Sequence, residues 1–257
     1  MASLLIDSHV HLNDELLFPR ASDVIKDAMA EGVGVFVCIG YDRFFSERAI
    51  ALAHQYPNIY AAIGFHPEGA HKVVEGDYEW LREAAKDERV VAIGEIGLDY
   101  YWDKNHIEAQ KEVFKRQIEI ANELRLPIAV HLREALFDTL NLIKKHKRPD
   151  LKGVMHCYSG SAQAMLDFLA LNMYISLAGP VTFKNARVPK EVAAQVPIER
   201  LLIETDSPYL APHPYRGKPN EPKYLRHIAE EIASIKGISY EEVAEATSLN
   251  ARNLFGL

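Results

Sequence analysis

The chain has 257 residues, of which 48% are hydrophobic, and its formal net charge is −7. This length is typical of one barrel of alternating strands and helices, so we expect a single globular domain over residues 1–257. The negative charge excludes a protein that coats long nucleic acid non-specifically, because such proteins are usually basic. A phosphate-bearing substrate still fits if positive charge gathers in one pocket.

No apolar run approaches the roughly 20 residues that cross a bilayer, and the start lacks the basic and apolar segments of a secretory signal. Cys38 and Cys157 lie in runs that predict buried strands, so we expect no disulfide. We therefore expect a cytoplasmic protein that does not associate with membranes. Nothing in the sequence predicts a protein partner.

Short apolar runs alternate with helical segments along the whole chain. The apolar runs are continuous, as in parallel strands that are covered on both faces. The expected strands are 4–6, 34–39, 59–64, 90–94, 126–130, 153–155, 173–177 and 201–204. The expected helices are 21–32, 44–56, 78–86, 106–125, 136–146, 162–171, 190–195, 224–236 and 240–254, the last with a capping box from Ser239 and Glu242.

This alternation predicts an α/β protein with a single (β/α)8 TIM-type barrel, and the alternative is an open doubly wound sheet. We favour the barrel because residues of chemical interest follow six of the eight expected strands. An open sheet gathers its ligands mainly at one switch point, whereas a barrel brings the carboxyl end of every strand to one mouth.

The first of these residues are His9 and His11, at the end of the first strand. Side chains alternate in an extended chain, so both imidazoles point the same way and can ligate one metal ion. A lone His-x-His pair is equally typical of surface or packing histidines. The prediction therefore depends on the whole set at strand ends: His9, His11, Glu95, His131, His156 and Asp206.

Six nitrogen and oxygen ligands are too many for one tetrahedral ion with an open position. They suit two divalent ions about 3.5–4 Å apart, an arrangement used for displacement at phosphorus and for some amide hydrolysis. Glu95, from the middle of the chain, is the natural bridge between the ions. With two carboxylates and four neutral histidines, the filled site carries a charge of about +2, which attracts a phosphodiester. Zinc, magnesium and manganese all remain open.

The motifs around these residues resemble the TatD family of metal-dependent deoxyribonucleases, in the amidohydrolase superfamily. The matching segments are Asp7–Leu12, Gly64–Pro67, Gly94–Tyr100, Val130–Arg133, His156–Gly160, Glu204–Leu210 and Arg216–Pro222, which together span nearly the whole chain.

The resemblance implies a two-metal hydrolase that cleaves DNA phosphodiester bonds, at ends or in single strands, with water activated by both ions. It assigns His9, His11 and Asp206 to one ion, His131 and His156 to the other, and Glu95 to both. Asp206 would also accept the proton of the attacking water, which makes Glu95 and Asp206 the catalytic residues.

Two further residues stand at strand ends. His66 follows the third strand and is expected to contact substrate, to support a ligand or to serve as a spare ligand. Glu204 faces the same way as Asp206 and is expected to orient a ligating histidine through its free ring N–H.

Positive and aromatic residues near the expected mouth of the barrel predict a substrate-binding surface. Arg133 either binds a phosphate or forms a salt bridge with Asp99 or Glu134. Arg216 lies in a loop after strand eight, where this fold often binds phosphate. The aromatic run 100–102 either stacks on an unpaired base or packs its loop against the rim.

Two other functions stay open. The same metal platform could cleave an ester or amide, such as an aminoacyl-tRNA bond or a cyclic amide. Amide hydrolases of this superfamily often have a lysine after strand four, where this chain has Glu95, so we favour the nuclease. The chain could also be a catalytically silent metal-binding scaffold, although its complete ligand set argues against that.

Overall fold

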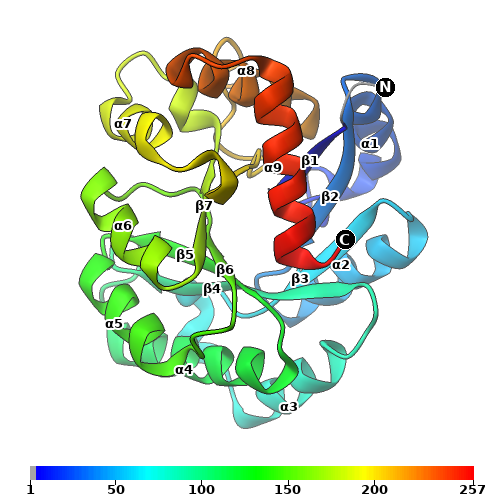
Figure 1. Cartoon of the computed structure of the whole chain (residues 1–257). Helices are drawn as coiled ribbons and strands as arrows, with labels where there is room; N and C mark the ends of the chain where they lie inside the picture. The colour runs from blue at the N-terminus through cyan, green and yellow to red at the C-terminus, as the bar shows by residue number, and fades with distance from the viewer. Residues whose placement is uncertain (1–3) are drawn as a thin grey trace.

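The computed structural model describes residues 4–257, in which eight parallel strands pair in chain order from β1 to β8. The first and last strands also meet: the Asp206 N–H donates to the His9 carbonyl at 3.0 Å, and the His11 N–H donates to the Ser207 carbonyl at 2.8 Å. The sheet therefore closes into a (β/α)8 barrel, as predicted, and the open sheet is excluded. The helices surround it as an outer layer (Figure 1).

The strands are β1 (Leu5–Val10), β2 (Val33–Ile39), β3 (Ile59–Ile63), β4 (Val90–Asp99), β5 (Ile128–Arg133), β6 (Gly153–Met155), β7 (Met173–Leu177) and β8 (Leu201–Ile203). The α-helices are α1 (Ala21–Ala30), α2 (Arg43–Gln55), α3 (Glu75–Ala84), α4 (Ile107–Leu124), α5 (Leu136–His146), α6 (Ala162–Ala170), α7 (Arg187–Gln195), α8 (Leu225–Lys236) and α9 (Tyr240–Phe255).

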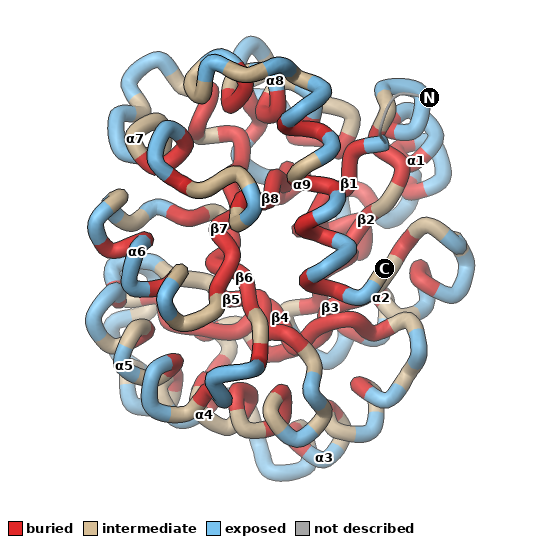
Figure 2. The backbone as a smooth tube through the Cα atoms, viewed as in Figure 1, coloured by how far each residue is buried: buried red, intermediate tan, exposed pale blue. Residues whose placement is uncertain are grey.

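The strands are the most buried part of the chain, as the red tube in Figure 2 shows. One cluster of buried side chains lies between the strands and the helices. A second cluster joins side chains from most of the strands, such as Val37 and Ile39, to Leu254 and Phe255 of α9. Helix α9 thus seals one end of the barrel, and the opposite end is left for chemistry (Figure 1).

Three strands run further than predicted, and the first of them is β1, which continues from the expected end at residue 6 to Val10. We expected one strand to end at residue 94 and the next at 130, but β4 continues to Asp99 and β5 to Arg133, which face each other in register. The predicted strands end where the apolar runs stop, but pairing continues beyond them, and the glycines of β4 permit close packing: at Gly97 (φ +144°) a Cβ would lie 2.0 Å from the His131 carbonyl oxygen. Strands β4 and β5 therefore reach into the barrel mouth.

Two helices begin three residues earlier than predicted. Helix α3 starts at Glu75 because the Asp77 carboxylate accepts the Val74 N–H at 2.9 Å, which caps the first turn. Helix α7 starts at Arg187 and keeps Pro189 within its first turn, where no N–H is needed. The predicted capping box of α9 is confirmed, with Ser239 and Glu242 bonded to each other's N–H groups.

Within residues 4–257, no helix combines the length and apolar character that a membrane span requires. Cys38 and Cys157 are free thiols, as predicted. The first three residues of the predicted domain lie outside the described part of the chain.

Candidate metal centre

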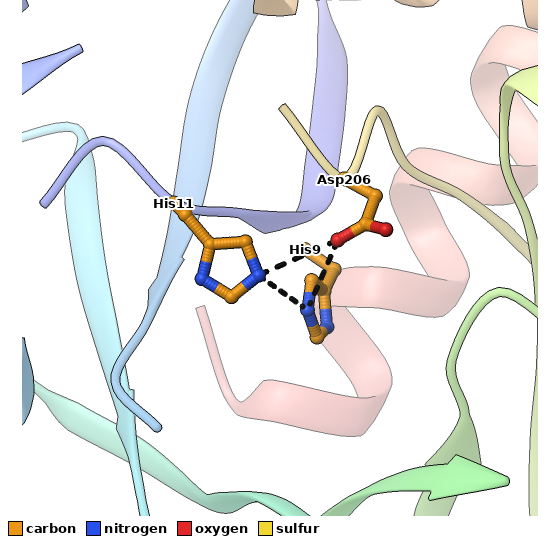
Figure 3. A group of neighbouring side chains, drawn as sticks. All are labelled: His9, His11 and Asp206. Atoms are coloured by element: carbon orange, nitrogen blue, oxygen red, sulfur yellow. Dashed lines mark hydrogen bonds and ion pairs between the residues drawn. The ribbon is translucent and has the colours of Figure 1, made fainter. Parts of the chain in front are cut away.

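Barrel closure brings three of the predicted ligands together, although they come from opposite ends of the chain. The Nε2 atoms of His9 and His11 are 3.3 Å apart, and they lie 3.7 and 3.4 Å from Oδ1 of Asp206 (Figure 3). All three residues are at most 9% exposed. One small ion would therefore contact all three.

The protonation of His11 supports a cation at this position. Its Nδ1 lies 3.1 Å from the Ile39 carbonyl oxygen, which can only accept, so in the neutral ring Nδ1 carries the hydrogen. The Nε2 lone pair then faces His9 and the Asp206 carboxylate. Donor atoms around a tetrahedral zinc ion stand roughly 3.3–3.4 Å apart, which is close to the separations observed here. The residues present fit a divalent metal ion.

Glu95 joins this group to a second one. Its Oε1 lies 2.9 Å from both His131 Nδ1 and His156 Nε2, whereas its Oε2 faces His9 at 3.6 Å and His11 at 3.9 Å. The carboxylate is buried, with 5% of the residue exposed. Each oxygen of Glu95 thus faces a different set of imidazoles, which is the geometry of a carboxylate between two ions.

Two outer carboxylates fix the rings of the second group. Glu204 Oε1 lies 2.9 Å from His156 Nδ1, and Asp99 Oδ2 lies 2.9 Å from His131 Nε2. Each carboxylate accepts a ring N–H, so the opposite nitrogen presents its lone pair to Glu95 and the site. Carboxylate–histidine pairs of this kind orient metal ligands and raise their basicity.

A contact between a carboxylate and a ligating histidine was predicted for Glu204 but not for Asp99. Glu95, Gly97 and Asp99 alternate along β4, so a longer predicted strand would have placed Asp99 on the same face as Glu95.

Removal of the charge on Asp99 should weaken metal binding without unfolding the barrel. We expect Asp99→Asn to bind zinc or manganese about 10–100-fold more weakly, because the amide no longer fixes the His131 tautomer. Isothermal titration of the metal-free protein measures this. The matched control is Asp103→Asn, because Asp103 accepts from His106 Nδ1 at 2.9 Å in the same way but near the surface. Equal losses in both variants would contradict the assigned role of Asp99.

One contact fixes the first strand relative to the segment that follows the last strand. The buried Asp7 carboxylate accepts the Thr205 N–H at 2.9 Å and the Thr205 hydroxyl at 2.6 Å. Burial raises the pKa of Asp7 to about 7, although these hydrogen bonds oppose the rise. The strand that carries His9 is thereby tied to the residue before Asp206. No role was predicted for Asp7, because no local sequence pattern reveals a contact between two residues so far apart along the chain.

Three imidazoles of the site bind a proton more tightly than a free histidine does when no metal is bound, whereas burial lowers the pKa of His9. Burial alone lowers the pKa of His156, but the charges of Glu95 and Glu204 overcome it and raise that pKa well above its usual value. The pKa values of His131 and His11 are also raised, against their burial, by hydrogen bonds to Asp99 and to Asp206. A metal ion must displace these protons, because it competes for the same lone pairs.

Metal affinity should therefore fall as the pH falls. The raised pKa values leave a fraction of these rings protonated even above pH 6.5, so we expect apparent affinity to drop about tenfold per pH unit for each proton displaced. Calorimetry at pH 7 in buffers with different ionisation enthalpies counts the protons released. An affinity that is constant from pH 6 to pH 8, with no release, would refute this prediction.

His66 lies beside the second group. Its Nδ1 accepts the Glu68 N–H at 3.3 Å, so the neutral ring carries its hydrogen on Nε2, which lies 3.6 Å from Glu95 Oε1. Burial lowers the pKa of His66 to about 3, which keeps the ring neutral. In this tautomer the side chain directs an N–H into the site, where it can donate to a substrate oxygen. His66 also forms, with Glu95 and His131, a group whose ligand atoms lie within 4.8 Å of one another, so both predicted roles stay open.

Arg133 forms neither of the salt bridges considered from the sequence. Asp99 is occupied by His131, and no carboxylate within residues 4–257 lies at ion-pair distance from the guanidinium. It lies instead over the rings of Tyr101 and Trp102, with its central carbon 4.1 and 5.5 Å from their centroids. Of the two alternatives predicted for Arg133, the salt bridge to Asp99 does not form because that carboxylate already accepts from His131.

Arg216 lies in the loop between β8 and α8, with its guanidinium 4.4 Å from the ring centroid of Phe183. No carboxylate in the described part of the chain forms an ion pair with it. Both predicted phosphate ligands, Arg133 and Arg216, therefore keep their charge unpaired.

The charge expected from the sequence needs correction. We counted two carboxylates against two divalent ions, but Asp99 and Glu204 belong to the same cluster. With these two included, the filled site carries a charge of about zero rather than about +2. The attraction for a phosphodiester must therefore come partly from cations outside the cluster.

One other group of metal-type side chains lies within the described residues. His71, Asp103 and His106 have potential ligand atoms within 4.8 Å of one another, and the two rings stack at 4.2 Å. All three are partly exposed, and His106 is already hydrogen-bonded to Asp103. This surface group provides a control for the buried one.

Comparison with known proteins identifies the family. A family profile described as TatD related DNase matches residues 6–256. The chain belongs to the TatD family. The TatD-family relatives include an uncharacterized metal-dependent hydrolase, YabD, from Bacillus subtilis. It is 47% identical over 252 residues, and the alignment covers 98% of this chain and 99% of YabD.

Two other TatD relatives bear on fold and chemistry. A protein of Citrobacter rodentium named 3'-5' ssDNA/RNA exonuclease TatD is 34% identical over 258 residues, with 98% of each chain covered. The crystal structure of YjjV, a TatD homolog from Escherichia coli, superimposes with a TM-score of 0.95 at 29% identity and covers 100% of both chains. The chain is thus a TatD-family metal-dependent hydrolase with the barrel of its relatives.

Proposed function

We propose that this protein is a deoxyribonuclease that uses two divalent metal ions to cleave phosphodiester bonds at DNA ends or in single strands. The observation that carries the proposal is the buried Glu95 carboxylate, whose two oxygens face two separate sets of imidazoles. A two-ion site of this kind suits in-line displacement at phosphorus. The name of the Citrobacter rodentium relative, a 3'-5' ssDNA/RNA exonuclease, supports this substrate class.

In this proposal six side chains would hold the metals: His9, His11 and Asp206 one ion, His131 and His156 the other, with Glu95 shared between them. When bound, the ions would supply an activated water and neutralise charge on the scissile phosphate.

The remaining roles belong to the protein's own groups. The neighbouring histidines keep the pKa of Asp206 low despite its burial, so its carboxylate is ionised and ready to accept a proton. His66 donates its Nε2–H to a phosphate oxygen, and Arg133 and Arg216 bind the flanking phosphates. We also propose that the whole chain acts as one domain, because the first and last strands share the site.

The test is reconstitution of the metal-free protein with zinc, manganese or magnesium, followed by assay on end-labelled single-stranded and duplex DNA. We expect cleavage that depends on metal and is faster on single strands or frayed ends. Aminoacyl-tRNA and a cyclic amide serve as comparison substrates. Faster turnover of either one would replace the nuclease with an ester or amide hydrolase. Metal binding without any hydrolysis would leave a silent scaffold.

A further inference from the structure

Two exposed aromatic side chains stand at the mouth of the barrel, just beyond the end of β4. Tyr101 is 45% exposed and Trp102 is 64% exposed, and their rings meet edge to face at 4.8 Å. Tyr100, the third residue of this run, instead packs at the rim, where its hydroxyl donates to Asp138 at 2.7 Å. Exposure of two large neighbouring aromatic side chains to water is unfavourable, so their surface is a candidate binding site.

The aromatic pair is tied to the proposed metal site through a single side chain. Asp99 Oδ1 accepts the N–H groups of Tyr101 and Trp102, each at 2.8 Å, while its Oδ2 holds His131 Nε2 at 2.9 Å. Gln110 adds to this support by donating to the Asp99 carbonyl at 3.0 Å. The start of the loop is therefore held at a fixed position relative to a predicted metal ligand.

A cation completes this surface. Arg133 lies two residues beyond His131 on β5, a rise of about 6.6 Å toward the mouth. Its guanidinium covers both rings, and no carboxylate in residues 4–257 neutralises it. Because the filled metal cluster has a charge of about zero, this free charge is well placed to attract a phosphate near the reacting one.

We propose that Tyr101, Trp102 and Arg133 form a platform on which an unpaired base of a single-stranded nucleic acid stacks, next to the bond to be cleaved. Arg133 binds the phosphate of that nucleotide. Aromatic rings combined with arginine are the usual means of holding a single strand without reading its sequence. The inference rests on the proposed nuclease function and deepens it: a paired base in duplex DNA has no free face to offer, so the platform selects single strands.

Binding tests the platform without catalysis. The probe is a short single-stranded oligonucleotide that carries 2-aminopurine, mixed with the metal-free protein in chelator. We expect wild type to quench its fluorescence by stacking, Trp102→Ala to bind about tenfold more weakly with little quenching, and Trp102→Phe to recover most of both. The matched control is Leu249→Ala, because Leu249 is also exposed, at 55%, but lies on α9, which packs against the opposite end of the barrel. Equal losses in Leu249→Ala and Trp102→Ala would overturn the platform.

Kinetics separate this inference from the nuclease proposal. We expect Trp102→Ala to raise KM about tenfold on an oligonucleotide, with kcat little changed, and to leave hydrolysis of an abasic oligonucleotide and of bis(p-nitrophenyl) phosphate unaltered. Equal losses with and without a base would refute the platform and leave the nuclease intact. If wild type hydrolyses no phosphodiester with any metal, the nuclease proposal fails, and the binding assay still decides whether a base stacks.

Discussion

Glu95→Gln is expected to lose at least about 10³-fold of the phosphodiesterase activity, well beyond the 10–100-fold typical of an outer partner. The amide keeps the shape of the side chain but replaces one oxygen with an NH₂ group that cannot ligate a metal. Because each oxygen faces a different set of imidazoles, the variant cannot contact both ions. Steady-state rates on single-stranded DNA, together with metal content from atomic absorption, measure the effect.

The matched control for this experiment is Glu68→Gln. Glu68 lies close by in the short 3-10 helix Pro67–Lys72, but its side chain is 53% exposed and its ion-pair contact is with His66, at 3.9 Å. We expect this variant to keep near wild-type rates and metal content. Robust cleavage by Glu95→Gln, freed of contaminating nuclease, would remove the basis of the two-metal site.

Metal removal is expected to destabilise the protein as well as to abolish its activity. An ion that binds only the folded state at a thousandfold excess over its Kd stabilises it by about 4 kcal/mol. For a chain of this size, that corresponds to a fall in Tm of about 8–16 °C on chelation. Differential scanning calorimetry with zinc or manganese, and then with chelator, measures the shift.

The surface group supplies the control for this second prediction. His71→Ala removes one of its possible ligands and should leave the metal-dependent shift in Tm unchanged. His9→Ala, in the buried group, should remove most of the shift. If His71→Ala were the variant that lost it, the stabilising ion would sit at the surface, and the buried cluster would not be the main metal site.

The sequence was most informative where chemistry and topology coincide. All six predicted ligands come together because each lies in the carboxyl-terminal half of a parallel strand or just after it, and a barrel directs all such ends to one mouth. The prediction required only the succession of apolar runs and the identity of the residues that follow each run. It did not require exact strand boundaries, which were wrong for the ends of β1, β4 and β5.

The errors have a common physical cause, because they depend on contacts between distant segments. The apolar runs stop at residues 94 and 130, but β4 continues because β5 pairs with it as far as Asp99. The role of Asp99 was hidden as a result, and with it the neutral charge of the filled cluster. The tie between Asp7 and Thr205 joins residues 198 positions apart and leaves no local pattern.

The closure of the barrel also governs when this protein can become active. Nearly all of the chain must leave the ribosome before Asp206 can reach His9 and His11, because that carboxylate arrives with the last strand. An incomplete polypeptide that stops before β8 lacks both the Asp206 carboxylate and the Thr205 contact with Asp7. A half-made chain therefore has no assembled centre, and hydrolytic competence appears only when synthesis is nearly finished.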